Sequence, residues 1–271
     1  MIVYPHAKIN LGLRILRRRP DGYHDIETLL YPVGWSDILE ILPSPGSRDI
    51  RIRTSGLSLP GRSSDNLVYR AASLMQERFG LTGMRIHLHK QVPAGAGLGG
   101  GSSDAAFTLM ALRELFSLSL PPRELHRMAT QLGSDCAFFL EDTPALATGR
   151  GDKLTPVSLD LQGTYLMIIF PGIVSATARM YRMIQPADEG ISLKEAIEKP
   201  RSEWMKYLIN RFEEPLVRDF PVIGTVIKLL VAHGAWYASV TGSGSAVYGL
   251  FDTPPGKIPL SPGWLSWTEQ L

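Results

Sequence analysis

Apolar and polar positions alternate over short stretches in the first part of the chain. Residues 49–54 alternate between charged and apolar or β-branched side chains, and residues 84–89 set Ile86 and Leu88 between polar neighbours. This period of two is typical of β-strands, as are short apolar runs bounded by Pro and Gly. The pattern predicts strands over residues 9–16, 36–42, 49–54 and 84–89.

A three-to-four spacing of apolar residues replaces the alternation after Asp65. We expect Asp65 to cap a helix that Gly80 stops, because a short acidic side chain accepts from free helix amides and glycine suits a left-handed end. A second helix is expected over residues 103–116. A third begins at residues 121–122 and ends at Gly133, where we expect a left-handed glycine cap.

The second half of the chain mixes the two patterns. An uninterrupted apolar run over residues 166–170 predicts a buried strand. Further helices are expected over residues 193–198, 204–212 and 222–233, and further strands over residues 237–241 and 246–251. We place a lobe boundary near residue 155, which divides the chain into lobes 1–155 and 156–271.

Composition places the chain among ordinary globular proteins. Its 271 residues are 44% hydrophobic and 20% charged, which argues against disorder. The net charge of +2 is too small to indicate nucleic acid as the main partner. The first residues lack a cationic region followed by a long apolar run, and no stretch reaches membrane-spanning length without charge. We therefore expect neither secretion nor membrane insertion.

Two local features add to this picture. Cys136 is the single cysteine of the sequence, which excludes an intramolecular disulfide and a Cys-rich metal cluster and fits a cytoplasmic location. A dense basic run, Arg14 with residues 17–19, precedes the turn sequence at residues 20–22. Such a run is typical of a solvated turn flank; the alternative is a rim that attracts an anionic substrate.

A glycine-rich loop between an expected strand and an expected helix is the strongest chemical signal. Phosphate groups need several inward-pointing backbone amides, and glycines before a helix N-terminus supply them without blocking side chains. A hairpin turn needs only one or two glycines, whereas this loop has five in the seven positions 95–101. We expect ATP phosphates on Pro93, Ala94, Gly95, Ala96, Gly97, Leu98, Gly99, Gly100, Gly101, Ser102 and Ser103.

Three other phosphate-binding motifs fit this loop less well. A P-loop requires a lysine after its last glycine, but here Ser102 follows Gly101. A dinucleotide fingerprint requires a second strand that ends in an acid, and residues near 120 begin a helix instead. A protein-kinase loop lies between strands, with a strand lysine after it.

The remaining pattern resembles the phosphate loop of the galactokinase, homoserine, mevalonate and phosphomevalonate kinase (GHMP kinase) superfamily. Residues 7–13 and 19–26 resemble the N-terminal signature of the 4-diphosphocytidyl-2-C-methyl-D-erythritol kinases, and residues 133–139 and 240–245 are similar to their later motifs. The chain departs from that pattern at His6, where proline is usual, and at Cys136-Ala137. These departures affect the local geometry beside Asp135, and Cys136 reads as a packing residue.

The resemblance implies a catalytic pair, Lys8 and Asp135. Phosphoryl transfer to an alcohol needs a carboxylate that accepts the hydroxyl proton, which is the role expected of Asp135. Lys8 would lie against it and keep it ionised. Without the resemblance, an aspartate after a helix-ending glycine is more often a helix cap, and a lone strand lysine is a surface residue.

The resemblance also implies the ligand contacts. Asn66 is expected either near the adenine of ATP or as a helix cap, and Ser103 among the contacts of ATP and Mg²⁺; the sequence contains no obvious carboxylate cage for the metal ion. The substrate contacts expected from the resemblance are Asn10, Tyr23, His24, Thr177, Tyr181, Gly242 and Ser243. Asn10, Tyr23 and His24 would recognise the cytidine group, and Tyr181 would stack on the cytosine. Residues 242–245 read as a second backbone cradle that supports the first loop or substrate phosphates.

The fold that the resemblance implies is a two-lobed α+β GHMP-kinase fold. The N-terminal lobe would contain a left-handed βαβ element and bind ATP, and the C-terminal lobe would be ferredoxin-like and bind the substrate. The implied reaction is ATP-dependent phosphorylation of the 2-hydroxyl of 4-diphosphocytidyl-2-C-methyl-D-erythritol in non-mevalonate isoprenoid biosynthesis. Another GHMP kinase is the first alternative. The second, a nucleotide sensor without catalysis, fits poorly because Lys8 and Asp135 are both present.

Overall fold

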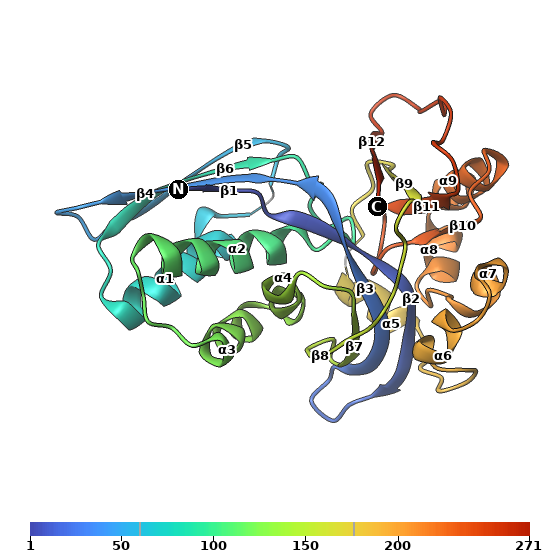
Figure 1. Ribbon diagram of the computed structural model, residues 1–271, viewed down its shortest axis with the longest axis horizontal. Coiled ribbons are helices and arrows are strands. Elements are labelled where there is room, and N and C mark those ends of the chain that lie inside the picture. The colour runs from blue at the N-terminus through green and yellow to red at the C-terminus, as the bar shows by residue number, and fades with distance from the viewer. Residues whose placement is uncertain (60, 176) are drawn as a thin grey trace. The chain divides into compact units, whose positions relative to one another are not determined.

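The chain folds into two compact units (Figure 1). The computed structural model describes residues 1–59, 61–175 and 177–271. Unit 1 consists of Met1–Ala7, Gly34–Ala94 and Gly99–Asp142, and unit 2 consists of Lys8–Val33, Gly95–Leu98 and Thr143–Leu271. Among the described residues, every helix is too short or too polar to cross a bilayer.

Unit 1 is built on a four-stranded sheet with the order β1-β4-β6-β5. Its strands are β1 (Ile2–Val3), β4 (Ile38–Ser44), β5 (Ile50–Gly56) and β6 (Gly83–Lys90). β4 runs antiparallel to β6, whereas β5 runs parallel to β6. The parallel pair is connected through α1 (Leu67–Phe79), so β5, α1 and β6 form a βαβ element.

Helices cover one side of this sheet, as Figure 1 shows for α1 and α2 (Gly100–Leu115). The remaining helical segments of unit 1 are η1 (Ser63–Asp65), α3 (Pro122–Leu132), η2 (Ser134–Ala137) and α4 (Phe138–Glu141). The core between helices and sheet is apolar because the alternation on β6 sends Ile86 and Leu88 to the same side, where Leu109 of α2 and Met75 of α1 belong to the same buried cluster.

Unit 2 contains two four-stranded sheets. The first has the order β2-β3-β7-β8, with β2 (His6–Arg18), β3 (His24–Ser36), β7 (Ala145–Gly149) and β8 (Lys153–Pro156). The second is antiparallel, in the order β10-β11-β9-β12, with β9 (Tyr165–Phe170), β10 (Tyr237–Val240), β11 (Val247–Phe251) and β12 (Leu265–Gln270). The first two residues of β2 and the last three of β3 belong to unit 1.

Six helical segments complete unit 2 among the described residues. They are α5 (Thr177–Met183), α6 (Leu193–Ile197), η3 (Arg201–Glu203), α7 (Trp204–Tyr207), α8 (Glu213–Asp219) and α9 (Pro221–Ala232). Of these, α9 and α7 contact the second sheet. α9 lies against β10 and β11, and Val226 and Leu230 on this helix share a buried cluster with Ile169 and Val247. An antiparallel sheet covered by helices is the α+β arrangement.

The strands and long helices predicted from periodicity are confirmed, but three helix ends differ. The cap of α1 is Asn66, whose Oδ1 accepts from Val68 N at 2.9 Å, while Asp65 accepts from Arg62 N and closes η1. α2 begins at Gly100 instead of residue 103, because the last glycines of the loop are already helical. Gly133 has an extended backbone with φ 179°, so the predicted left-handed cap is wrong; the chain continues directly into η2.

The helix predicted over residues 204–212 is also too long, because α7 ends at Tyr207. The residues that follow pair with β2 instead: Leu13 N donates to Ile209 O at 3.0 Å, and Arg211 N donates to Leu13 O at 2.9 Å. These tertiary hydrogen bonds outweigh the local helical pattern, since each backbone group can satisfy only one of the two arrangements.

Strands β1, β3, β7, β8 and β12 were not predicted. β3 lacks a sustained alternating pattern because the consecutive Leu29 and Leu30 interrupt it. Two acids in this strand, Asp25 and Glu27, are nevertheless buried. Arginines on β2 neutralise both carboxylates: Arg14 contacts Glu27 at 2.6 Å and Arg17 contacts Asp25 at 2.5 Å. The basic run is therefore largely paired with acids of the neighbouring strand, which supports its interpretation as a turn flank.

Contact density divides the chain differently from a cut near residue 155. Lys8–Val33 and Gly95–Leu98 belong to the same compact unit as the C-terminal residues. The assignment of ATP to residues 1–155 and of substrate to residues 156–271 stays a prediction.

We expect Leu109→Ala to lower the free energy of unfolding by about 2–5 kcal/mol, because it leaves a cavity in the core of unit 1. Leu109 is fully buried, whereas its neighbour Met110 is only partly buried, so Met110→Ala should cost less. Urea denaturation of the two variants measures this difference. Equal losses would contradict the assignment of Leu109 to the centre of the core.

Candidate active site

Lys8 is a buried lysine on β2, in unit 2. The residue is only 3% exposed. Its Nζ donates to Asn10 Oδ1 and, at 2.9 Å, to Gly97 O. An ammonium group withdrawn from water must find hydrogen-bond acceptors. The surface position typical of a lone strand lysine is therefore excluded, and the glycine loop itself supplies one acceptor.

Thr241 closes this cluster from the C-terminal part of unit 2. Its hydroxyl accepts from Asn10 N at 3.1 Å and lies 3.1 Å from both Asn10 Oδ1 and Gly97 O, to either of which it can donate. Asn10 Nδ2 donates to Thr28 Oγ1 at 2.9 Å, so the amide of Asn10 is held on both sides. These contacts form one buried polar network, which we call the Lys8 cluster. Its members are Lys8, Asn10, Thr28, Gly97 and Thr241.

Two glycines allow the loops of the Lys8 cluster to approach closely. Gly97 has φ +82°, and a Cβ atom there would lie 1.9 Å from Thr241 O. Gly242 has φ +55°, and its Cβ would lie 3.0 Å from Gly97 O. Within unit 2, the second glycine loop therefore packs against the first. Residues 242–245 were expected either to support the first loop or to contact substrate phosphates. This contact fits the first of these roles.

The glycine-rich loop has a backbone in which every second residue is left-handed. Gly95, Gly97 and Gly99 all have positive φ angles, of 67°, 82° and 72°, while Gly100 and Gly101 begin α2. Such a run of left-handed residues before a helix turns successive amides toward the same side, as anion binding requires. The order strand, glycine loop, helix is confirmed.

A buried triad that the sequence did not reveal lies under the helix end of this loop, in unit 1. Lys90 Nζ donates to Asp37 Oδ2 and, at 2.8 Å, to Asp104 Oδ2. Asp37 Oδ1 also accepts from the amides of Gln91 and Val92 at 2.6 and 2.9 Å. A Cβ on Gly100 would lie 3.3 Å from Lys90 Nζ. The triad thus joins the end of β6 to the first turn of α2.

Charge and burial compete within the triad. Burial alone would lower the pKa of Lys90, but Asp104 and Asp37 together raise that pKa above its ordinary value. Burial raises the pKa of Asp104 to about 7, with Lys90 offsetting part of the effect and Asp37 adding to it. Among the described residues, Asp104 Oδ1 and Ser103 Oγ have no hydrogen-bond partner although both atoms are buried. One signal could have shown the triad: Lys90 continues the inward positions of Ile86 and Leu88 on β6.

Asp135 lies in η2 of unit 1, half-buried, between α3 and α4. This turn packs against the first turn of α2: the Cys136 thiol hydrogen-bonds to Ser102, and a Cβ on Gly133 would lie 3.8 Å from Ser102 Oγ. Burial raises the pKa of the Cys136 thiol to about 12, so it is no thiolate nucleophile at neutral pH. His6, the other departure, packs edge-on against Phe107 and Phe139.

The aromatic residues expected at the cytidine lie in unit 2. His24 stacks on Tyr181 with a centroid distance of 5.1 Å and an interplanar angle of 21°. Burial, and then the charge of Arg18, lower the pKa of His24, which favours the neutral imidazole. Tyr23 precedes this pair and is 57% exposed. Thr177 and Ser243 share a hydrogen bond between their hydroxyls at 2.8 Å. Four of the seven expected substrate contacts therefore form two contacting pairs.

Asn66 caps α1, as noted above, which is one of its two expected roles. The described residues contain no group of three or more His, Cys, Asp or Glu side chains that could hold a metal ion. Two oxygens without a partner among the described residues, Ser103 Oγ and Asp104 Oδ1, are nevertheless of the hard type that Mg²⁺ prefers.

Taken unit by unit, these residues have the chemistry of phosphoryl transfer. Unit 1 holds a helix N-terminus suited to phosphate and a half-buried carboxylate suited to accept a proton. Unit 2 holds a buried ammonium group beside the glycine loop and an aromatic pair with a neutral imidazole.

Comparisons with known proteins agree with this chemistry. The sequence matches the GHMP kinases N terminal domain over residues 66–143 and the GHMP kinases C terminal domain over residues 193–257. It is 46% identical over 260 residues to the 4-diphosphocytidyl-2-C-methyl-D-erythritol kinase of Bacteroides thetaiotaomicron, covering 96% of this chain and 94% of the relative. The kinase of the same name from Cytophaga hutchinsonii is 43% identical over 256 residues, with 94% of each chain covered.

Solved structures show the same relationship. A crystal structure of 4-(cytidine 5'-diphospho)-2C-methyl-D-erythritol kinase superposes with a TM-score of 0.79 at 36% identity, covering 94% of this chain and 91% of that one. A homoserine kinase from Cytophaga hutchinsonii has a TM-score of 0.69 at 18% identity over 98% of this chain and 94% of its own, which indicates a shared fold.

Gly97→Ala should destabilise the protein, because the new Cβ meets Thr241 O and an L-residue is strained at φ +82°. Gly101→Ala is a matched control. Gly101 lies within α2, and its Cβ would come no closer than 3.9 Å to Leu67 Cδ1. Thermal denaturation compares them. A melting temperature that falls for Gly101→Ala but not for Gly97→Ala would contradict the close approach of the two loops.

Asp104→Asn should change how stability depends on pH. The pKa of Asp104 is raised from 3.8 to about 7, so the folded protein holds this proton more tightly than the unfolded chain. Its stabilising contribution is present below the ordinary pKa and is lost as pH rises through about 7. The melting temperature of the wild type relative to Asp104→Asn should therefore fall between about pH 4 and about pH 7 and level off at higher pH. A constant difference would show that Asp104 does not titrate in this range.

Proposed function

This chain belongs to the 4-diphosphocytidyl-2-C-methyl-D-erythritol kinases of the GHMP kinase family, and from that membership we propose how its residues carry the reaction. It is a small-molecule kinase with the GHMP-kinase fold, as the resemblance predicted. It phosphorylates the 2-hydroxyl of 4-diphosphocytidyl-2-C-methyl-D-erythritol in the non-mevalonate route to isoprenoid precursors. The observation that carries this conclusion is 46% identity across 96% of the chain.

ATP is the phosphate donor in this family, and the glycine loop is our candidate for its phosphate site. The left-handed glycines at positions 95, 97 and 99 and the N-terminus of α2 support this assignment, because both present amides to an anion. Bound Mg²⁺ would neutralise charge on the phosphate oxygens. The Ser103 hydroxyl would contact it, since this buried oxygen has no partner among the described residues.

Asp135 is the proposed base. It would accept the proton of the substrate hydroxyl while that oxygen forms a bond to the γ-phosphorus and the bond to the ADP oxygen breaks. Lys8 would supply positive charge near the reacting groups. Its burial and its bonds to Asn10 and Gly97 support this role, because they fix the ammonium group in one position.

Tyr23, His24 and Tyr181 are the proposed contacts of the cytidine group. Aromatic faces stack on a base, and a neutral imidazole can donate and accept hydrogen bonds at its polar edge. Thr177 and Ser243 would contact the substrate through their paired hydroxyls, and Gly242 through its backbone. The buried contacts of Asn10 favour a role in holding Lys8 over the direct base contact that the resemblance implies. A cytoplasmic location remains part of this proposal and rests on the single cysteine.

An assay of ADP release with the cytidylyl substrate, galactose, homoserine and mevalonate tests the substrate assignment. Turnover is expected with the first compound alone. Preferred turnover of homoserine or mevalonate would favour another GHMP kinase, and binding of ATP without turnover of any compound would favour a nucleotide sensor.

Asp135→Asn should lower kcat by about 10²–10⁴, because the amide cannot accept the hydroxyl proton. Binding of a fluorescent ATP analogue should be largely retained. Asp142→Asn is the matched control: Asp142 is an exposed carboxylate at the end of α4, with a left-handed backbone that Asn also tolerates. An unchanged kcat for Asp135→Asn would place the base elsewhere.

A further inference from the structure

The turn between β2 and β3 holds Tyr23 by its backbone. Arg19 N donates to Tyr23 O at 2.8 Å, and Tyr23 N donates to Asp21 Oδ1 at 3.1 Å. Gly22, with φ +85°, completes the turn. Although the Tyr23 side chain is 57% exposed, the place from which its ring projects is thus determined.

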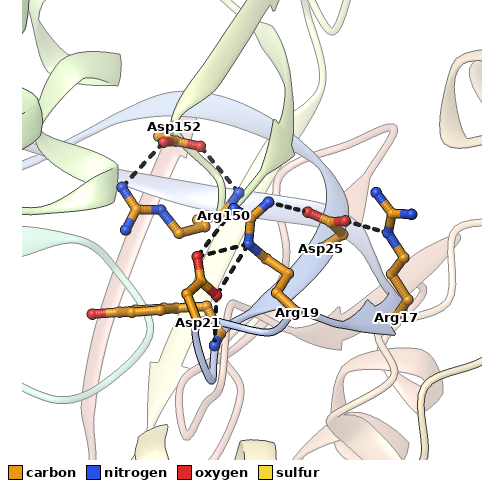
Figure 2. A network of polar contacts seen from close by, with 7 residues as sticks. Arg17, Arg19, Asp21, Asp25, Arg150 and Asp152 are labelled. Atoms are coloured by element: carbon orange, nitrogen blue, oxygen red, sulfur yellow. Dashed lines mark hydrogen bonds and ion pairs between the residues drawn. The ribbon is translucent and has the colours of Figure 1, made fainter.

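A chain of alternating charges reinforces this turn, as Figure 2 shows. Arg19 contacts Asp21 at 3.0 Å and Asp25 at 2.7 Å, and Arg17 contacts Asp25 at 2.5 Å. The hydrogen bond from Arg19 lowers the pKa of Asp21, and those from Arg19 and Arg17 lower the pKa of Asp25. Both carboxylates are therefore ionised at neutral pH, and the network stays intact.

The turn between β7 and β8 brings a further arginine to the same place. β7 pairs with β3, with Ile26 opposite Gly149, so the next residue, Arg150, lies beside the β2–β3 turn. Its backbone amide donates to Asp152 Oδ1 at 3.0 Å, which shapes the turn between two left-handed glycines. In Figure 2 the side chains of Arg150 and Asp152 lie beside Asp21 and Arg19.

The Arg150 guanidinium lies over the ring of Tyr23. Its central carbon is 5.1 Å from the ring centroid, within the range of a cation–π contact. The Arg150 side chain is 36% exposed, and Asp152 contacts it at 3.5 Å, so the Tyr23 ring and this carboxylate both help to hold it in place. A cation on one face of an aromatic ring restrains its plane and draws electron density from the opposite face.

We propose that Arg150 is a positioning residue for substrate recognition: it holds the plane of the Tyr23 ring so that the opposite face stacks on the pyrimidine base of the substrate. The inference rests on the proposed contact between Tyr23 and the cytidine group. Arg150 acts through the ring, so its loss weakens the binding of the cytidylyl substrate without changing the chemical step or the binding of ATP.

The main alternative is that Arg150 attracts the anionic diphosphate directly through its charge. Arg17 distinguishes the two, because it is 78% exposed, carries the same charge and contacts Asp25 at the other end of the network. Removal of either arginine would weaken substrate binding if charge alone mattered. A role through the ring concerns Arg150 alone and disappears when the ring is removed.

The test is a double-mutant cycle with steady-state kinetics. Arg150→Ala should raise KM for the cytidylyl substrate by about two- to fivefold, the range of an exposed cation–π contact, with kcat and KM for ATP unchanged. Arg150→Lys should recover part of the loss, and Arg17→Ala should match the wild type. In a Tyr23→Leu background, Arg150→Ala should have no further effect on KM.

The proposal would be overturned if Arg150→Ala raised KM by the same factor in the wild-type and Tyr23→Leu backgrounds. It would also be overturned if Arg17→Ala raised KM as much as Arg150→Ala. So would unchanged KM in Arg150→Ala with a normal melting temperature. These outcomes leave the proposed function intact as long as the wild type phosphorylates the cytidylyl substrate. If the wild type does not, the function itself fails, and the inference with it.

Discussion

Burial of the Lys8 ammonium group is the constraint on which the proposed catalytic arrangement of unit 2 depends. A charge removed from water needs acceptors in fixed positions, and Lys8 obtains them from Asn10 on its own strand and from a carbonyl of the glycine loop. The same carbonyl lies 3.1 Å from the Thr241 hydroxyl, and the lack of a Cβ on Gly97 allows this close approach. The Lys8 cluster therefore joins three segments that are distant in sequence. It holds the Lys8 ammonium group against the glycine loop before any ligand binds.

Unit 1 also buries an ammonium group, but there two carboxylates surround it, so negative charge is in excess. Lys90 faces two carboxylates, and the amides of Gln91 and Val92 bind the same Asp37. The raised pKa of Asp104 expresses the cost of placing two acids around one base in a buried site. Because this triad lies under Gly100, it determines where the glycine loop ends and α2 begins, which is where an anion would meet the free amides of the helix.

Aromatic recognition in unit 2 depends on charges that are themselves paired. The basic run at residues 17–19 resembled either a turn flank or an attractive rim, and the structure places Arg17 and Arg19 on Asp21 and Asp25. Ion pairs with one exposed or partly exposed partner add little stability singly, but several in one network can hold a turn in one conformation. In the proposed substrate contact, Arg19 holds the backbone of Tyr23 within this turn, and Arg150 contacts its ring.

Local features determined much of this protein. Periodicity predicted the paths of β2, β4, β5, β6 and α1, because an amphipathic pattern must bury its apolar side whatever else the chain does. The glycines at 95–101 predicted an anion cradle for equally local reasons of backbone geometry, and motif resemblance indicated the family. Tertiary structure decided what depends on partners distant in sequence: the end of α7, which pairs with Leu13; the acidic strand β3, stabilised by arginines; and the Lys90 triad. The stacking of Tyr23 on Arg150 is of the same kind, since two turns separated by more than a hundred residues meet only after the sheet has formed.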